Sequence, residues 1–293
     1  MTLSASQKEA IAGYAFILPI MSGFLLFLAF PVVASFFVSL ADWNLINDPE
    51  FAGIGNYIQL FQDPFFWTCL KNTAYFSLFA VLFGMFLSLY LANLIHETKP
   101  KGASFFKSSL FLPVILSSVA VALVWQWLLD GQMGMINHLL NMVGLPSVPW
   151  LTSPAVALNS VILVAVWRQI GYNMVIFLAA LANVPDELYE ASSLDGASRF
   201  QTFWNVTWPL ISPATFFIAV TSIINSFQVF DITTILTNGG PANSTNTLIM
   251  MIYQNGFQFF KMGYASGIAY VLFGIILIIT AIQTIVSKRW VHS

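Results

Sequence analysis

The chain contains 293 residues, of which 58% are hydrophobic and 8% are charged, and its formal net charge is −2. Charged residues make up about a quarter of a typical soluble domain, so the composition excludes a water-soluble globular protein, and the lack of a basic stripe excludes a nucleic-acid-binding protein. The 28 Phe residues and the mean hydropathy of +0.80 indicate a surface that faces a lipid bilayer.

Six apolar stretches are each long enough to cross the hydrocarbon core as a helix, which takes roughly 20 residues. In chain order they cover residues 14–40, 73–94, 110–129, 156–181, 210–230 and 264–286. None of them shows the strict alternation of a membrane β-strand. We therefore expect an all-α membrane protein with six transmembrane helices, forming a single transmembrane domain over residues 1–293.

The positions of Lys and Arg predict the orientation, because positively charged loops stay in the cytoplasm. With the N-terminus inside, seven of the ten positive residues become cytoplasmic: Lys8, Lys99, Lys101, Lys107, Arg199, Lys288 and Arg289. The opposite orientation places these seven outside. We therefore expect both termini to be cytoplasmic.

The cytoplasmic loop between the fourth and fifth spans, residues 184–209, carries the signals of two short helices. Pro185 stands in the opening turn of the first, and Asp186 follows where the helix dipole favours an acid. Gly196 is placed to end this helix, and Ser198 can cap the second. The loop is therefore expected to be ordered.

The second loop helix is expected to carry an aromatic stripe. Its members are Phe200, Phe203, Trp204 and Trp208, which are spaced at i, i+3, i+4 and i+8. Such a stripe suits a helix that lies in the membrane interface, where Trp is favoured.

The first loop helix has a surface of small residues, Ala191, Ser192 and Ser193, between the acids Glu190 and Asp195. Small side chains let the surface of another protein approach closely. A solvated turn without a partner explains the same residues equally well, so the residues alone leave both interpretations open.

The same loop resembles a known motif. Residues 190–197 read E-A-S-S-L-D-G-A and residues 208–213 read W-P-L-I-S-P, which resembles the EAA motif of permease subunits in binding-protein-dependent ABC importers, E-A-A-x-x-D-G-A and then L-P-x-I-x-P. Ser192 replaces the second alanine, and Trp208 replaces the usual leucine. Three further segments resemble the maltose-type, sugar-importing branch of that family: F-A-G-I-G-N-Y at 51–57, F-Q-V-F-D at 227–231 and G-G-P-A-N at 239–243.

This resemblance implies that the first loop helix is a coupling helix that sits in a groove of an ATPase subunit. By position, the coupling residues would be Glu190, Ala191, Ser192, Asp195 and Gly196. The implied partners are a second permease subunit in a heterodimer, an ABC ATPase dimer and an extracytoplasmic solute-binding protein. The implied location is the plasma (inner) membrane of a prokaryote.

Polar side chains inside membrane spans are expensive, so they are candidates for a solute pathway. The seven candidates are Trp167, Arg168, Gln169, Tyr172, Asn173, Asn225 and Gln228. Their amide and hydroxyl groups can replace water around a hydroxyl-rich solute, and the indole ring can lie against a sugar ring. The alternative is that these amides hold helices together.

Arg168 is the most informative of these residues. A positive charge near the middle of a span indicates either an anionic substrate or a buried acid on a partner subunit. The sequence leaves both open, and it does not identify the solute.

The leading hypothesis is therefore a permease subunit of an ATP-driven, binding-protein-dependent importer of a sugar or related polyol, and it forms half of the translocation pathway. The alternative is a secondary transporter or channel for a polar solute. The sequence contains no G-x-x-x-x-G-K-[ST] loop, so ATP and magnesium are expected on a separate ATPase subunit, with no cofactor on this chain. The spans hold no His and no paired acids, and Cys69 is the single cysteine, so we expect neither an enzyme nor a metal site.

Overall fold

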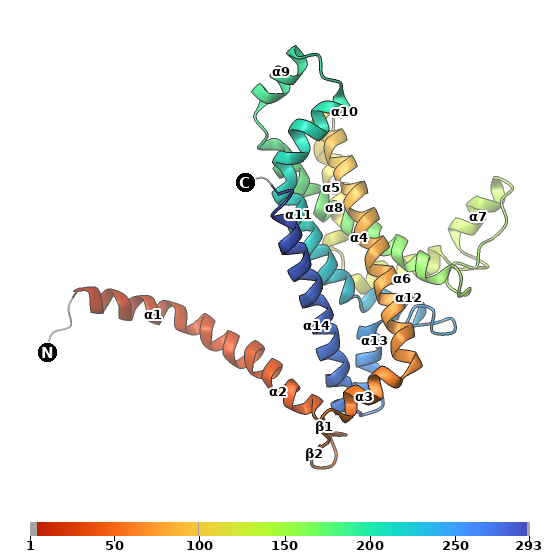
Figure 1. Cartoon of the computed structure of the whole chain (residues 1–293). Coiled ribbons are helices and arrows are strands. Elements are labelled where there is room, and N and C mark those ends of the chain that lie inside the picture. The colour runs from red at the N-terminus through yellow and green to blue at the C-terminus, as the bar shows by residue number, and fades with distance from the viewer. Residues whose placement is uncertain (1–4, 99, 292–293) are drawn as a thin grey trace. The chain divides into compact units, whose positions relative to one another are not determined.

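The computed structural model describes residues 5–98 and 100–291, and this part of the chain is mostly helical (Figure 1). Lys99, one of the residues that predict the orientation, lies outside the described residues. The chain divides into two compact units, the first formed by Met1–Gln62 and Ile252–Tyr270 and the second by Asp63–Met251 and Val271–Ser293.

The first unit begins with a long apolar helix that a π-helical turn interrupts. Its parts are α1 (Ala5–Phe24), η1 (Leu25–Ala29) and α2 (Phe30–Ser39). Pro31 has no N–H to donate to the preceding turn, and the π turn ends two residues before it. The irregular turn therefore has a local cause in the sequence.

A small polar network closes the first unit after α2. It contains the antiparallel strands β1 (Ala41–Asp42) and β2 (Glu50–Phe51), then α3 (Gly55–Gln62), and it also includes η3 (Gln254–Gln258) and the first residues of α14 (Met262–Ser287). The buried Asn56 amide donates to the carbonyl oxygens of Ser39 and Ala41, each at 2.9 Å. The hydroxyls of Tyr57 and Ser39 lie 2.7 Å apart. The F-A-G-I-G-N-Y segment thus fastens α3 to the end of the first helix.

Three long helices form the centre of the second unit: α4 (Pro64–Thr98), α8 (Ala157–Ala182) and α11 (Trp208–Phe227). The most extensive helix contact joins α4 to α8. The buried side of α4 carries mostly small residues at intervals of about one or two turns: Cys69, Thr73, Ser77, Gly84, Ser88 and Ala92. Small residues let helix backbones approach closely in a membrane, where no hydrophobic force drives helices together.

The third predicted span is not one continuous helix. It is divided into α5 (Ala103–Ile115) and α6 (Ser118–Leu128), which are bent by 102° at the break between them. The residues expected as one span, 110–129, therefore belong to two helices, because Leu116 and Ser117 are extended there. Both halves are apolar, so hydropathy alone does not reveal the break.

Five described helical stretches are long and apolar enough to cross a membrane, and a sixth is added if the bent pair counts as one span. The five are Ile11–Ser39, Pro64–Thr98, Ala157–Ala182, Arg199–Phe227 and Met262–Ser287. This result agrees with the expected all-α architecture of about six spans.

Shorter helices lie between the long ones in the second unit. They are α7 (Met135–Met142), α9 (Asp186–Leu194), α10 (Arg199–Thr202), the π turn η2 (Phe203–Thr207), α12 (Asp231–Thr237) and α13 (Leu248–Tyr253), whose last two residues belong to the first unit. The helices α9 and α10 precede α11, and α12 follows it, so they lie at opposite ends of that helix (Figure 1).

The G-G-P-A-N segment after α12 is attached to α4. Asn72 donates from its amide to the carbonyl oxygens of Asn243 and Asn246, at 2.9 and 3.0 Å. Gly239 has φ +81°, and a Cβ there would lie 2.5 Å from the Asn246 side chain. Glycine is required at this position for both reasons.

Candidate functional site

The loop between α8 and α11 forms the two short helices that the sequence predicts. Gly196, at φ +72°, follows the end of α9, and the Ala197 N–H donates to the Ser192 carbonyl at 3.0 Å. Ser198 caps α10 through a reciprocal pair of hydrogen bonds with Gln201. Both predicted signals, the glycine stop and the serine cap, are confirmed.

The surface of α9 is open. No residue of this helix is buried, and the Leu194 side chain is 89% exposed. Among the predicted coupling residues, Glu190, Ala191, Asp195 and Gly196 are all exposed. Most of the surface of α9 is therefore accessible, and the coupling role of these residues stays a prediction.

Ser192 differs from the other coupling residues because it is half-buried. Its hydroxyl lies 3.1 Å from the Thr202 hydroxyl and donates to the Tyr189 carbonyl at 3.1 Å. The serine that replaces alanine in the motif therefore joins α9 to α10 within the loop.

The aromatic stripe of the second loop helix continues into α11 and reaches Trp290. The rings of Trp204 and Trp208 lie 5.4 Å apart, and those of Phe203 and Trp204 lie 5.5 Å apart. Trp208 in turn stacks on Trp290 at 6.3 Å. The stripe predicted from the spacing thus forms one connected aromatic cluster.

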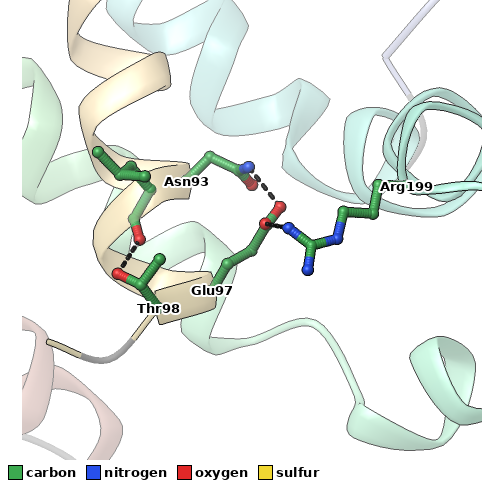
Figure 2. Close-up of polar contacts among 5 residues, drawn as sticks. Asn93, Glu97, Thr98 and Arg199 are labelled. Atoms are coloured by element: carbon green, nitrogen blue, oxygen red, sulfur yellow. Dashed lines mark hydrogen bonds and ion pairs between the residues drawn. The ribbon is translucent and has the colours of Figure 1, made fainter.

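A pocket of about 410 Å³ lies between the loop and the end of α4; we name it the loop pocket. Its lining includes Glu97, Arg199, Asn93, His96 and Tyr189. The Arg199 guanidinium lies 3.7 Å from the Glu97 carboxylate, which also accepts a 2.6 Å hydrogen bond from Asn93 (Figure 2). An ion pair thus bridges α4 and α10.

Sequence reasoning missed this ion pair. Glu97 follows the second apolar stretch, and Arg199 is the single positive residue of the loop at 184–209. One acid and one base are a weak signal in the sequence, because 101 other residues separate them and only the packing of α4 beside the loop brings them together.

A second cavity, of about 420 Å³, lies among α4, α5, α8, α11 and α12; we name it the central cavity. Five of the seven predicted pathway residues line it: Arg168, Gln169, Tyr172, Asn225 and Gln228. The first three come from α8, and the other two come from the last residues of α11 and its C-cap. The structure therefore brings most of the polar candidates together.

The charges in the central cavity are not paired with each other. Within the described part of the chain, Arg168 has no carboxylate within 4.0 Å and no hydrogen-bonding partner. Asp231, the first residue of α12, also lines the cavity, but its carboxylate accepts a 2.6 Å hydrogen bond from the Ser118 hydroxyl. Gln169 donates to the Ser222 hydroxyl at 3.4 Å.

Two predicted pathway residues lie elsewhere. Asn173 is only 1% exposed, and its side-chain oxygen has no partner among the described residues. Trp167 lies in a separate, largely apolar cavity of about 610 Å³, where its ring is 5.3 Å from that of Trp125. The sequence did not single out Phe76 and Phe230, which also line the central cavity.

Comparison with known proteins agrees with the motif in the loop. Residues 14–292 match the family described as "Binding-protein-dependent transport system inner membrane component". The chain is 38% identical over 291 residues to the probable ABC transporter permease protein YesP of Bacillus subtilis (strain 168), covering 98% of this chain and 93% of that protein. It is 32% identical over 291 residues to the lactose transport system permease protein LacF of Rhizobium radiobacter, covering 98% and 97%.

A solved structure shows the same fold. It is the crystal structure of a bacterial alginate ABC transporter in complex with an alginate pentasaccharide-bound periplasmic protein. One of its chains superposes with a TM-score of 0.86 at 27% identity, covering 96% of both chains. The chain described here therefore belongs to the family of inner-membrane components of binding-protein-dependent transport systems.

Proposed function

We propose that this chain is a membrane-spanning subunit of an ATP-driven importer of a saccharide or related polyol. The observation that carries the proposal is the central cavity, in which amide, hydroxyl and guanidinium groups of α8 and α11 gather within the second unit. Such groups can replace water as hydrogen-bonding partners of a hydroxyl-rich solute. The lactose permease subunit and the alginate transporter among its relatives support a saccharide substrate.

The helix α11 offers a mechanical connection for this function. The loop leads directly into its first residue, Trp208, and its other end carries Asn225 and Gln228 of the central cavity. A helix of these 20 residues spans about 30 Å. A displacement of α9 by an ATPase would therefore reach the cavity wall through one continuous helix.

The proposed assembly contains a second permease subunit, an ABC ATPase dimer and an extracytoplasmic solute-binding protein. In it, α9 is the coupling helix, with Glu190, Ala191, Asp195 and Gly196 on the surface that meets the ATPase and Ser192 bracing it from within. ATP and magnesium bind to the ATPase subunits. Both termini lie in the cytoplasm, which places α9 on the side of the membrane where ATP is present.

The direct test is uptake by the purified complex in vesicles. Uptake of labelled saccharides should require both ATP hydrolysis inside and the binding protein outside, and a non-hydrolysable ATP analogue should stop it. Uptake that ignores ATP but collapses with an ion gradient would instead establish a secondary transporter, and passive flux without either would establish a channel.

A further inference from the structure

We propose that the solute is an anionic saccharide, with a carboxylate group that Arg168 binds in the central cavity. This inference rests on the proposed import function and names the substrate class of the same site. The observation behind it is an arginine in the cavity wall that has no partner in the described part of the chain.

The position of Arg168 makes an unpaired charge expensive. The residue lies near the middle of α8, a helix of 26 residues that is long enough to span a membrane. Charged side chains at that depth are rare, face a cavity and pair with a partner of opposite sign. A ligand that carries a negative charge supplies such a partner during transport.

The acid in the same cavity does not take this role. Asp231 lines the wall, but its carboxylate accepts the hydroxyl hydrogen of Ser118, the first residue of α6, and it is farther than 4.0 Å from Arg168. Asp231 thus joins α12 to α6, and the N–H groups of the Arg168 guanidinium remain available to bind another group.

The other polar groups of the cavity suit a sugar that carries the charge. Within the described residues, the side chains of Tyr172, Asn225 and Gln228 have no hydrogen-bonding partner, so they can form hydrogen bonds with the hydroxyl groups of a sugar. A guanidinium binds a carboxylate with two parallel hydrogen bonds. One positive charge matches a carboxylate better than a phosphate, whose charge at neutral pH is about −1.5 to −2.

The test compares matched acidic and neutral substrates in the complete complex with its cognate binding protein, reconstituted in vesicles. The probes are labelled oligosaccharides from polygalacturonate and from alginate, the same oligosaccharides after reduction of their carboxyl groups, lactose and a sugar phosphate. The wild-type complex should take up at least one acidic probe ten times faster than its reduced counterpart.

Three variants locate the effect. Arg168→Gln should lower uptake of the acidic probe at least tenfold, and Arg168→Lys should lower it less, because it keeps the charge but loses the two-pronged geometry. Lys107→Gln removes an exposed positive charge from α5 outside the cavity, and it should change uptake by less than twofold. The same binding protein serves all variants, so differences between them arise in the membrane subunit.

Other outcomes overturn the inference. If the complex prefers a neutral probe, or if Arg168→Gln leaves acidic uptake unchanged, Arg168 does not bind a substrate carboxylate. Loss of the second permease subunit from purified Arg168→Gln complexes, or an equal loss of acidic and neutral uptake, assigns Arg168 to an acid on the partner subunit. If the sugar phosphate is the only probe whose uptake depends on Arg168, the group that Arg168 binds is a phosphate and not a carboxylate. If no saccharide is taken up with ATP, the proposed function itself fails, and this inference fails with it.

Discussion

The central cavity and the loop pocket each contain one arginine and one acid, but only those of the loop pocket form an ion pair. Their volumes are similar, about 420 and 410 Å³, and each is lined by one arginine and one acid. In the loop pocket, Arg199 and Glu97 form an ion pair at 3.7 Å, whereas in the central cavity Asp231 bonds to Ser118 and leaves Arg168 unpaired.

The difference follows from the surroundings of the two arginines. The Arg199 side chain is 94% exposed, so water solvates it whether or not Glu97 is near, and such a pair contributes about 0–1 kcal/mol. That is small enough for the contact to break and re-form during a transport cycle. Arg168 lies in a helix long enough to span a membrane, where an unpaired charge is costly, and the ligand proposed above would pair with it.

The largest expected effect concerns the exposed surface of α9. Ala191→Arg places a long side chain on the exposed face of α9, and we expect it to weaken ATPase association by about 2 kcal/mol or more, roughly 30-fold. Co-purification of the ATPase and ATP-driven uptake would measure this. The thermal unfolding midpoint of the permease alone should not change, because no residue of α9 is buried; a lowered midpoint would show that α9 has a structural role.

The next effect concerns the close contact between α8 and α5. A Cβ at Gly171 of α8 would lie 2.0 Å from the carbonyl oxygen of Leu110 in α5, so Gly171→Ala should force the two helices apart and destabilise the protein by about 1–3 kcal/mol. Gly84→Ala is the matched control, because a Cβ at Gly84 meets nothing within 4 Å. Thermal unfolding in detergent compares them, and equal midpoints would contradict the close crossing at Gly171.

A smaller effect is expected within the loop. Ser192→Ala removes the contact with the Thr202 hydroxyl and should destabilise the loop by about 0.5–1.5 kcal/mol. Hydrogen exchange of the α9 and α10 amides would detect this as faster exchange. Thr202→Val should have a similar effect, and the double variant should add little, since both changes remove the same interaction.

The smallest effect is expected at the ion pair of the loop pocket. Glu97→Gln or Arg199→Gln should change stability by less than about 1 kcal/mol, and transport should fall by less than about fivefold. The charge-swapped double variant, Glu97→Arg with Arg199→Glu, should recover most of the lost stability and transport. High salt should reduce the differences among these variants, because it screens exposed charges. If Arg199→Gln abolished transport as completely as Arg168→Gln, the two arginines would not differ as proposed here.

The sequence predicts features that depend on local signals. The apolar lengths identify the spans, Gly196 and Ser198 identify the ends of the loop helices, and residue spacing identifies the aromatic stripe of residues 200–208. Each signal acts within a few residues, so distant packing does not alter it.

Features that depend on packing were less predictable. Hydropathy did not reveal the bend between α5 and α6, since both halves are apolar. Gln169 and Asn173 are one helical turn apart, yet Gln169 lines the central cavity and Asn173 is buried. Which amide meets the cavity depends on the neighbouring helices, and hydropathy carries no information about that.

The small residues on the buried side of α4 have a further consequence for movement. Side chains such as those of Ser88 and Ala92 do not interlock deeply with a neighbouring helix, and Ser88 contributes one hydrogen bond, to the Ile170 carbonyl of α8 at 3.0 Å. Small sliding of packed helices is one way in which domains close around ligands. The stripe on α4 can thus serve as a shear surface, along which α8 shifts by a fraction of a turn while the two helices remain in contact.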